Sequence, residues 1–152
     1  MKTNERESVS QTMVETLGIQ IEIVDKETVR ATMPVDHRTC QPFGILNGGA
    51  SLALAETAAG YGSLNIIPED KMACGIEVTG NHVGMAYVET QVTAIARLRH
   101  GGHLQHVWDV EITTEDGRTA SLVRVVNLVI PRTSVEMQRP RPNNLPSEES
   151  KE

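Results

Sequence analysis

Glu56 and the glycine pair Gly48-Gly49 have residue types and a spacing suited to chemistry on a carbonyl group. The glycines follow Asn47 and come directly before a run of small and apolar residues that predicts a helix. Backbone N–H groups at a helix N-terminus lack intrahelical partners and carry the positive end of the helix dipole, and glycine lets a ligand approach them closely. Such a turn can hold a carbonyl oxygen as it becomes an oxyanion, a large contribution in acyl-transfer catalysis. The alternative is that the glycines only permit a tight turn.

Glu56 is a single carboxylate among apolar neighbours about two helical turns after the glycines. No cation stands three or four residues away, where a helix-surface ion pair would place it. We therefore expect Glu56 to be partly desolvated, which would raise its pKa and strengthen it as a base or nucleophile. The competing interpretation is a Glu at the helix edge that points into solvent.

The remaining pattern predicts the elements that must position these groups. A helix is expected from about Gly48 to Ser63, its end loosened by Gly60 and Gly62, after a loop over residues 36–47. Alternation and β-branched residues predict a strand pair before the loop and a four-strand meander after the helix, at Ile19–Ile23, Thr28–Val35, Met72–His82, Tyr87–Leu98, Leu104–Thr114 and Thr119–Ile130. The sequence thus predicts an α+β fold with a curved antiparallel sheet around one long central helix.

Three segments are expected along the chain. Residues 1–17 form an N-terminal segment with a short helix within Ser8 to Gly18, because apolar residues recur there at helical spacing before a glycine. Residues 18–131 form the single folded domain. Residues 132–152 are rich in proline and poor in apolar residues, which predicts a disordered tail.

Composition excludes several classes of function. The 152-residue chain has a net charge of −6, which argues against a general nucleic-acid binder. It has neither a signal-peptide pattern nor an apolar run that could span a bilayer, so we expect a soluble cytoplasmic protein without a membrane partner. Cys40 and Cys74 have no metal-ligand spacing, so we expect two reduced thiols and no metal site.

The block from Arg38 to Thr57 contains Gln41-Pro-Phe-Gly-Ile-Leu-Asn-Gly-Gly49 followed by a helix and Glu56. It closely resembles hotdog-fold acyl-CoA thioesterases, in particular the PaaI-like group that includes 1,4-dihydroxy-2-naphthoyl-CoA and Arthrobacter-type 4-hydroxybenzoyl-CoA thioesterases. The resemblance extends more loosely from about Gly18 to Ile130. It implies a hotdog fold and hydrolysis of an aromatic or medium-chain acyl-CoA, with no cofactor because coenzyme A is part of the substrate.

The resemblance also implies a role for each polar group of the block. Glu56 would be the catalytic carboxylate, acting as nucleophile on the thioester or as base for water. The Gly48 N–H would polarise the thioester carbonyl, Gln41 would position the thioester or the water, and Thr57 is the small hydroxyl residue that often follows the glutamate. Asn47 replaces the histidine that most relatives carry, and cannot titrate.

Further residues are expected to contact the substrate. Gly60 replaces a Ser or Thr of relatives one turn beyond the catalytic glutamate, and cations are expected near the coenzyme A phosphates. The residues predicted to bind the substrate or coenzyme A are Gly49, Gly60, His82, Arg97, Arg99, His103 and Arg124.

The resemblance implies a homodimer or homotetramer, with Glu56 of one subunit facing the Gln41 loop of another. Because of Asn47 and Gly60, a non-catalytic hotdog protein that binds acyl-CoA as a sensor remains an alternative. A hotdog dehydratase or hydratase is a weaker alternative, since a histidine-based site would be expected where Asn47 stands.

Overall fold

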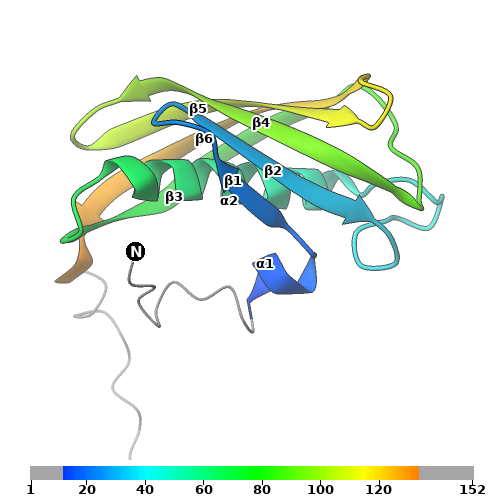
Figure 1. Cartoon of the computed structure of the whole chain (residues 1–152), viewed down its shortest axis with the longest axis horizontal. Coiled ribbons are helices and arrows are strands. Elements are labelled where there is room, and N and C mark those ends of the chain that lie inside the picture. Colours follow the sequence, from blue (N-terminus) through cyan, green and yellow to red (C-terminus); the bar gives the residue numbers. More distant parts are fainter. Residues whose placement is uncertain (1–11, 134–152) are drawn as a thin grey trace, which may run out of the picture.

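A computed structural model of the chain describes residues 12–133, in which one long helix is wrapped by a six-stranded sheet (Figure 1). The long helix, α2, spans Gly48–Ile66. The other elements are α1 (Met13–Thr16), β1 (Gln20–Ile23), β2 (Thr28–Val35), β3 (Lys71–His82), β4 (Thr90–Gly101), β5 (Gln105–Thr114) and β6 (Thr119–Pro131). Gly18, at a φ of +69°, ends the short N-terminal helix as glycine commonly does.

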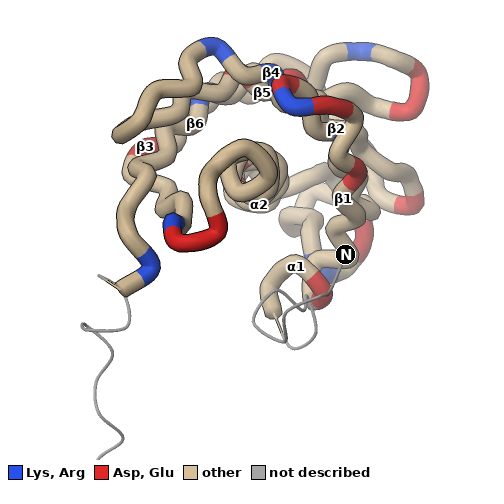
Figure 2. The backbone as a smooth tube through the Cα atoms, turned by 60° about the vertical axis from the view of Figure 1, so that its left-hand side comes forward, with Lys and Arg blue, Asp and Glu red and all other residues tan. Residues whose placement is uncertain are grey.

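The strands pair in the order β1-β2-β4-β5-β6-β3, every neighbour antiparallel. The sheet curls around α2, which lies in its concave face (Figure 2). The core between them consists mainly of alanine and β-branched residues with one large aromatic, and includes Val29, Met33, Leu54, Ala55, Ala58, Val92, Ala94, Trp108, Ile112 and Val125. This confirms the predicted α+β architecture.

The expectation of a four-strand meander after the helix is wrong. Only β4, β5 and β6 form a meander, whereas β3 lies at the far edge against β6 and β4 pairs with β2. Alternation shows which face of a strand is buried but not which strand lies beside it, so the order could not be read from the pattern. The consequence is that β3 presents a twelve-residue sheet edge.

The long helix continues past its predicted end at Ser63 to Ile66. Gly62 does not loosen it, because a methyl group there would lie 2.5 Å from the ring of Trp108, so the glycine instead allows the indole to pack against the helix. The helix ends where Ile67 becomes extended, as expected for the residue before Pro68.

The predicted N- and C-terminal segments fall largely outside the described residues. Residues 8–11 of the expected short helix and residues 134–152 of the expected tail are not among residues 12–133. At the predicted start of the tail, Arg132 donates from its backbone N–H to the carbonyl of Asp70 and from Nε to that of Glu69. Cys40 and Cys74 are both free and half-buried.

A buried polar cluster fixes the second half of α2 on the sheet. The Ser63 hydroxyl, fully buried, accepts from Trp108 Nε1 and Asn127 Nδ2 at 2.9 Å each and lies 3.0 Å from His106 Nδ1. Asn127 also donates to the Ala59 carbonyl. Since two donors fill the lone pairs of the hydroxyl, its own hydrogen is left to donate to His106 Nδ1. Burial lowers the pKa of His106 and outweighs a hydrogen bond to the Gly102 backbone that raises it.

Candidate active site

One face of α2 runs along the edge strand. Gly48, Leu52 and Glu56 are spaced four residues apart, so they lie on one side of the helix. The surroundings of two glycines show what this side contacts: a methyl group added at Gly48 would meet His82, and one added at Gly80 would meet Leu52. Gly48 and Glu56, which the sequence predicts to act on a carbonyl group, therefore both lie on the side of the helix that faces β3.

Asn47 is the N-cap of α2. Its Oδ1 accepts a hydrogen bond from the Gly49 N–H at 2.8 Å, which occupies the donor that Gly49 could have offered to a ligand. The N–H of Gly48, the first residue of the helix, has no acceptor among residues 12–133. Of the two predicted glycine donors, the structure thus leaves the one at Gly48 available.

A pocket of about 280 Å³ lies at this end of the helix and brings together three predicted site residues, Gln41, Gly48 and His82. The His82 Nδ1 is 2.9 Å from the Ser121 hydroxyl, which fixes the ring so that Nε2 is directed toward Gly48. A side chain at position 48 would overlap this ring, since its Cβ would lie 2.6 Å from Nε2. His82, which the sequence predicted to bind the substrate or coenzyme A, lies beside the candidate oxyanion donor.

Glu56 lies outside that pocket, and its carboxylate is positioned against Gly75 of β3. The side chain is exposed in the single chain, so the partial desolvation expected from the sequence is absent there. Thr57 donates its hydroxyl hydrogen to the Ala53 carbonyl at 2.7 Å, inside the helix. At Gly60, one turn past Glu56, an added methyl group would meet no atom of residues 12–133 outside the adjacent helix backbone, so space is open there among the described residues.

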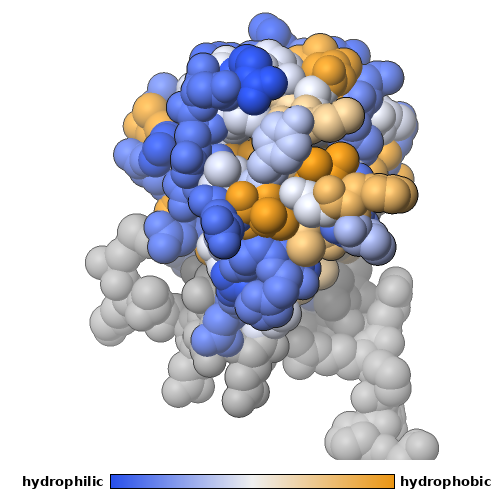
Figure 3. Space-filling view, turned by 90° about the vertical axis from the view of Figure 1, so that its right-hand side faces the viewer, coloured by the Kyte–Doolittle hydropathy of each residue, from blue (hydrophilic) through white to orange (hydrophobic). Residues whose placement is uncertain are grey.

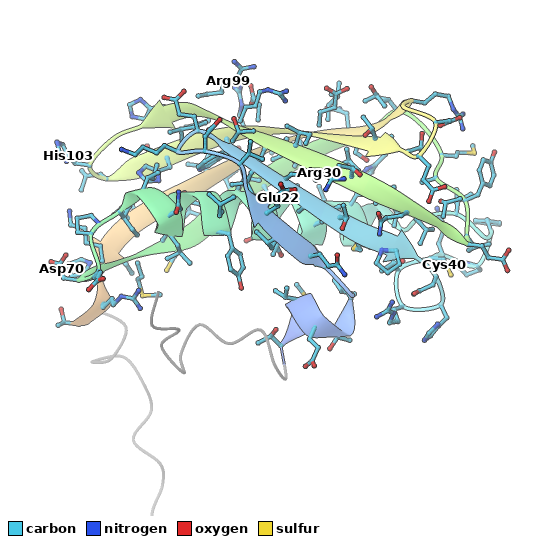
Figure 4. All side chains as sticks on the ribbon, viewed as in Figure 1. Glu22, Arg30, Cys40, Asp70, Arg99 and His103 are labelled. Atoms are coloured by element: carbon cyan, nitrogen blue, oxygen red, sulfur yellow. The ribbon has the colours of Figure 1, made fainter. Side chains whose placement is uncertain are left out.

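The predicted cations do not form one cluster. Arg97, Arg99 and Arg124 line a groove of about 490 Å³ on the sheet, while His103 lies at the β4–β5 turn. Figure 4 shows Arg99 projecting from the face of the sheet away from α2 and His103 at one end of the molecule. Asp109 joins two of the arginines, accepting from Arg124 Nε at 2.7 Å and Arg99 Nε at 2.9 Å. These hydrogen bonds, that of Arg124 first, lower the pKa of Asp109.

Exposed apolar side chains lie on or beside two of the segments that line the pocket, residues 41–46 and 82–86, a feature that sequence reasoning missed. Phe43 is 85% exposed, and Val83, Met85, Tyr87 and Val88 are also exposed. Figure 3 shows apolar side chains gathered on this end of the molecule. We call these five residues the apolar rim. Phe43 lies in the segment that the pattern assigned to a loop, and Tyr87 and Val88 lie at the start of a predicted strand. Val83 and Met85 lie between two predicted strands.

Two further observations concern metals and membranes. Within residues 12–133, no three His, Cys, Asp or Glu side chains are grouped so that they could hold a metal ion. Among the helices in that part of the chain, none has both the length and the apolar character needed to cross a bilayer.

Enzymes that transfer or hydrolyse acyl groups use backbone N–H groups to hold an oxyanion and carboxylates as nucleophiles or bases. In this chain, α2 carries an N–H beside a pocket, without an acceptor among residues 12–133, and a carboxylate on the same face. Residues 43–121 match the family model described as the thioesterase superfamily. The chain belongs to this superfamily and is a hotdog-fold thioester hydrolase.

Individual relatives agree with this assignment. The chain is 37% identical over 118 residues to the 1,4-dihydroxy-2-naphthoyl-CoA hydrolase of Escherichia coli, covering 78% of this chain and 86% of that protein. It is 36% identical over 119 residues to the proofreading thioesterase EntH of Cronobacter turicensis, covering 78% and 86%.

Solved structures agree with the fold. The crystal structure of a thioesterase from Haemophilus influenzae superimposes with a TM-score of 0.77 at 37% identity, over 81% of this chain and 85% of that chain. The PaaI protein of Escherichia coli gives a TM-score of 0.70 at 26% identity, over 77% and 83%. The hotdog fold and PaaI-like resemblance expected from the sequence are thereby confirmed.

Proposed function

We propose that the protein hydrolyses an aromatic or medium-chain acyl-CoA thioester to the free acid and coenzyme A. Glu56 acts as the nucleophile on the thioester carbon or as the base for water, and the Gly48 N–H stabilises the oxyanion. Gln41 positions the thioester or the water. The observation that carries the proposal is the Gly48 N–H, which lacks an acceptor among residues 12–133 and lines a pocket together with Gln41.

The proposed chemistry requires a site built from two copies of the chain. Gly48 and Glu56 are eight residues apart, so their Cα atoms are separated by about 12 Å along the helix. The carboxylate lies at Gly75, away from the pocket. A nucleophile and an oxyanion donor must both be within about 3 Å of one reacting carbonyl, so the two groups cannot serve it from one chain. We propose a homodimer or homotetramer in which Glu56 faces the Gln41 loop of a neighbouring copy.

Such an assembly would also explain why Glu56 is exposed in the single chain. Among residues 12–133, no strand pairs with the outer side of β3 beside it, and exposed edges are usually paired or covered. A second copy at this edge would exclude water from Glu56 and make it the desolvated carboxylate that the sequence predicts.

Two surfaces suit the parts of the proposed substrate. The apolar rim beside the pocket provides contacts for an aromatic or aliphatic acyl group or its pantetheine linkage. The groove with Arg97, Arg99 and Arg124 contains three cations against two carboxylates, Asp109 and Glu111, which favours an anion such as a coenzyme A phosphate.

The test is a thiol-release assay on a panel of aromatic and aliphatic acyl-CoAs with the parent protein, Glu56→Ala and Glu56→Asp. We expect release by the parent, near-complete loss in Glu56→Ala and partial activity in Glu56→Asp. Release that survives Glu56→Ala unchanged would overturn the proposed mechanism. Binding of CoA esters without release on the whole panel would favour the sensor that the sequence left as an alternative.

A further inference from the structure

A β-bulge in β3 stands directly beside Glu56. Gly75 pairs with Asn127, and the next pair on the same strands is Glu77 with Val126, so Ile76 is an extra residue without a cross-strand partner. Ile76 is 52% exposed. Bulges re-aim side chains and are over-represented next to active sites.

The bulge changes which residues of β3 face the helix. Gly75 lies opposite Asn127 and His82 lies opposite Ser121, and both of these β6 residues are buried on the helix side. Residues opposite one another in an antiparallel pair share a face, so Gly75 and His82 both face α2. They are seven residues apart, and in a regular strand an odd separation would put them on opposite faces. Without the bulge, only one of them could lie against the helix.

The backbone conformation of Gly75 does not require glycine, but the space around it does. Its φ is not positive, since the glycines with positive φ among residues 12–133 are Gly18, Gly44 and Gly117. A methyl group at position 75 would overlap Oε1 of Glu56 and lie 3.3 Å from Cδ. The three nearest atoms that it would meet all belong to the Glu56 side chain.

We propose that Gly75 and the adjoining bulge are a positioning device for the Glu56 carboxylate. The bulge turns position 75 toward the helix, and the missing side chain leaves the space that the carboxylate occupies. The same bulge keeps His82 beside Gly48, so one irregularity of the edge strand positions residues that this chain would contribute to two different sites of the assembly. This inference rests on the proposed function, because it gives Gly75 a role only through Glu56.

Gly75→Ala should create a steric overlap that costs little stability. The overlapped atom is the end of a flexible side chain, so the carboxylate can rotate away with little cost in stability. Its displacement by about 1 Å should lower kcat by roughly 10- to 100-fold while KM changes little. Gly101→Ala is the matched control, a strand glycine whose added methyl group would have the side chains of Leu98 and Ile66 as its nearest neighbours. It should keep the kcat of the parent.

A double-mutant cycle separates positioning from a general structural effect. Glu56→Asp withdraws the carboxylate by one methylene and removes the overlap with a methyl group at position 75. We expect the loss caused by Glu56→Asp to be smaller in the Gly75→Ala background than in the parent, a coupling that independent sites do not show. Thermal and urea unfolding midpoints of each variant should match those of the parent.

The possible outcomes distinguish failure of this inference from failure of the proposed function. A Gly75→Ala protein with the kcat of the parent, one that fails to fold, or a cycle in which the two losses simply multiply would each overturn the inference. If Glu56→Ala retains full activity, the proposed function fails instead. If Glu56→Ala is inactive while Gly75→Ala is unaffected, only the positioning role is lost.

Discussion

Replacing Ser63 by Ala should be among the most destabilising single changes in the long helix. The hydroxyl serves three buried partners, and its loss leaves two of them, Trp108 Nε1 and His106 Nδ1, without a protein partner. Asn127 retains its bond to the Ala59 carbonyl. Each orphaned buried group costs about 1–3 kcal/mol, so we expect a loss of roughly 2–6 kcal/mol in the free energy of unfolding.

Urea denaturation followed by tryptophan fluorescence measures this directly, since Trp108 is the single tryptophan of the chain and lies in the cluster. Ser51→Ala is the control, because Ser51 is also buried in α2 but lines the pocket and makes no side-chain hydrogen bond to another of residues 12–133. It should change stability by less than about 1 kcal/mol. A loss for Ser63→Ala no larger than that of the control would refute the reasoning that the cluster anchors the helix.

Three further predictions concern the helix and its surroundings. Gly62→Ala should lose about 1–3 kcal/mol by overpacking against the indole. Gly60→Ala, whose methyl group meets no side chain among residues 12–133, should gain about 0.5–1 kcal/mol; thermal unfolding measures both. Burial holds the pKa of His106 in the folded chain below its ordinary value, so the unfolded chain takes up a proton first as the pH falls. The free energy of unfolding should therefore decline below about pH 6.5 and level off below the folded pKa. Urea titrations should show this dependence in the parent and not in His106→Gln. Asn47→Asp should keep the helix cap and the melting temperature but lower kcat about tenfold, because its charge opposes an oxyanion at the Gly48 N–H.

The elements that carry the candidate site were predictable because their signals are local. The Gly48–Glu56 stretch is a continuous helical run, and the Asn47-Gly48-Gly49 turn precedes it directly, so capping and helix start follow from a few adjacent residues. The helix end was not predictable, since the reason for glycine at position 62 is its close packing against Trp108, which is distant in sequence. The same holds for Arg99 and Arg124, whose shared partner Asp109 comes from a third strand.

Two positions in the sequence could have predicted the buried polar cluster. His106 and Asn127 occupy inward-facing positions of their strands, two residues away from the buried Trp108 and Val125 respectively. A polar residue in register with inward-facing apolar ones must find a hydrogen-bond partner inside the core. That reasoning predicts a partner on the helix but cannot identify Ser63, because only the packed helix brings the hydroxyl between the two strands.

The separation of Gly48 and Glu56 along one helix leads to a last prediction. Suppose that each site takes Glu56 from one copy and Gln41 from its neighbour. The Glu56→Ala protein and the Gln41→Ala protein should then each be inactive. A dimer of one copy of each contains one intact site and one site that lacks both groups. Co-expression with random pairing should then recover about one quarter of the parental thiol release. Co-expression of Glu56→Ala with Glu56→Gln, which leaves no intact site in any pairing, should recover none. Recovery no greater than in this control would place both groups in one chain. Glu56 would then have to reach the pocket of its own chain, although its Cα lies about 12 Å along the helix from that of Gly48, at about 1.5 Å per residue.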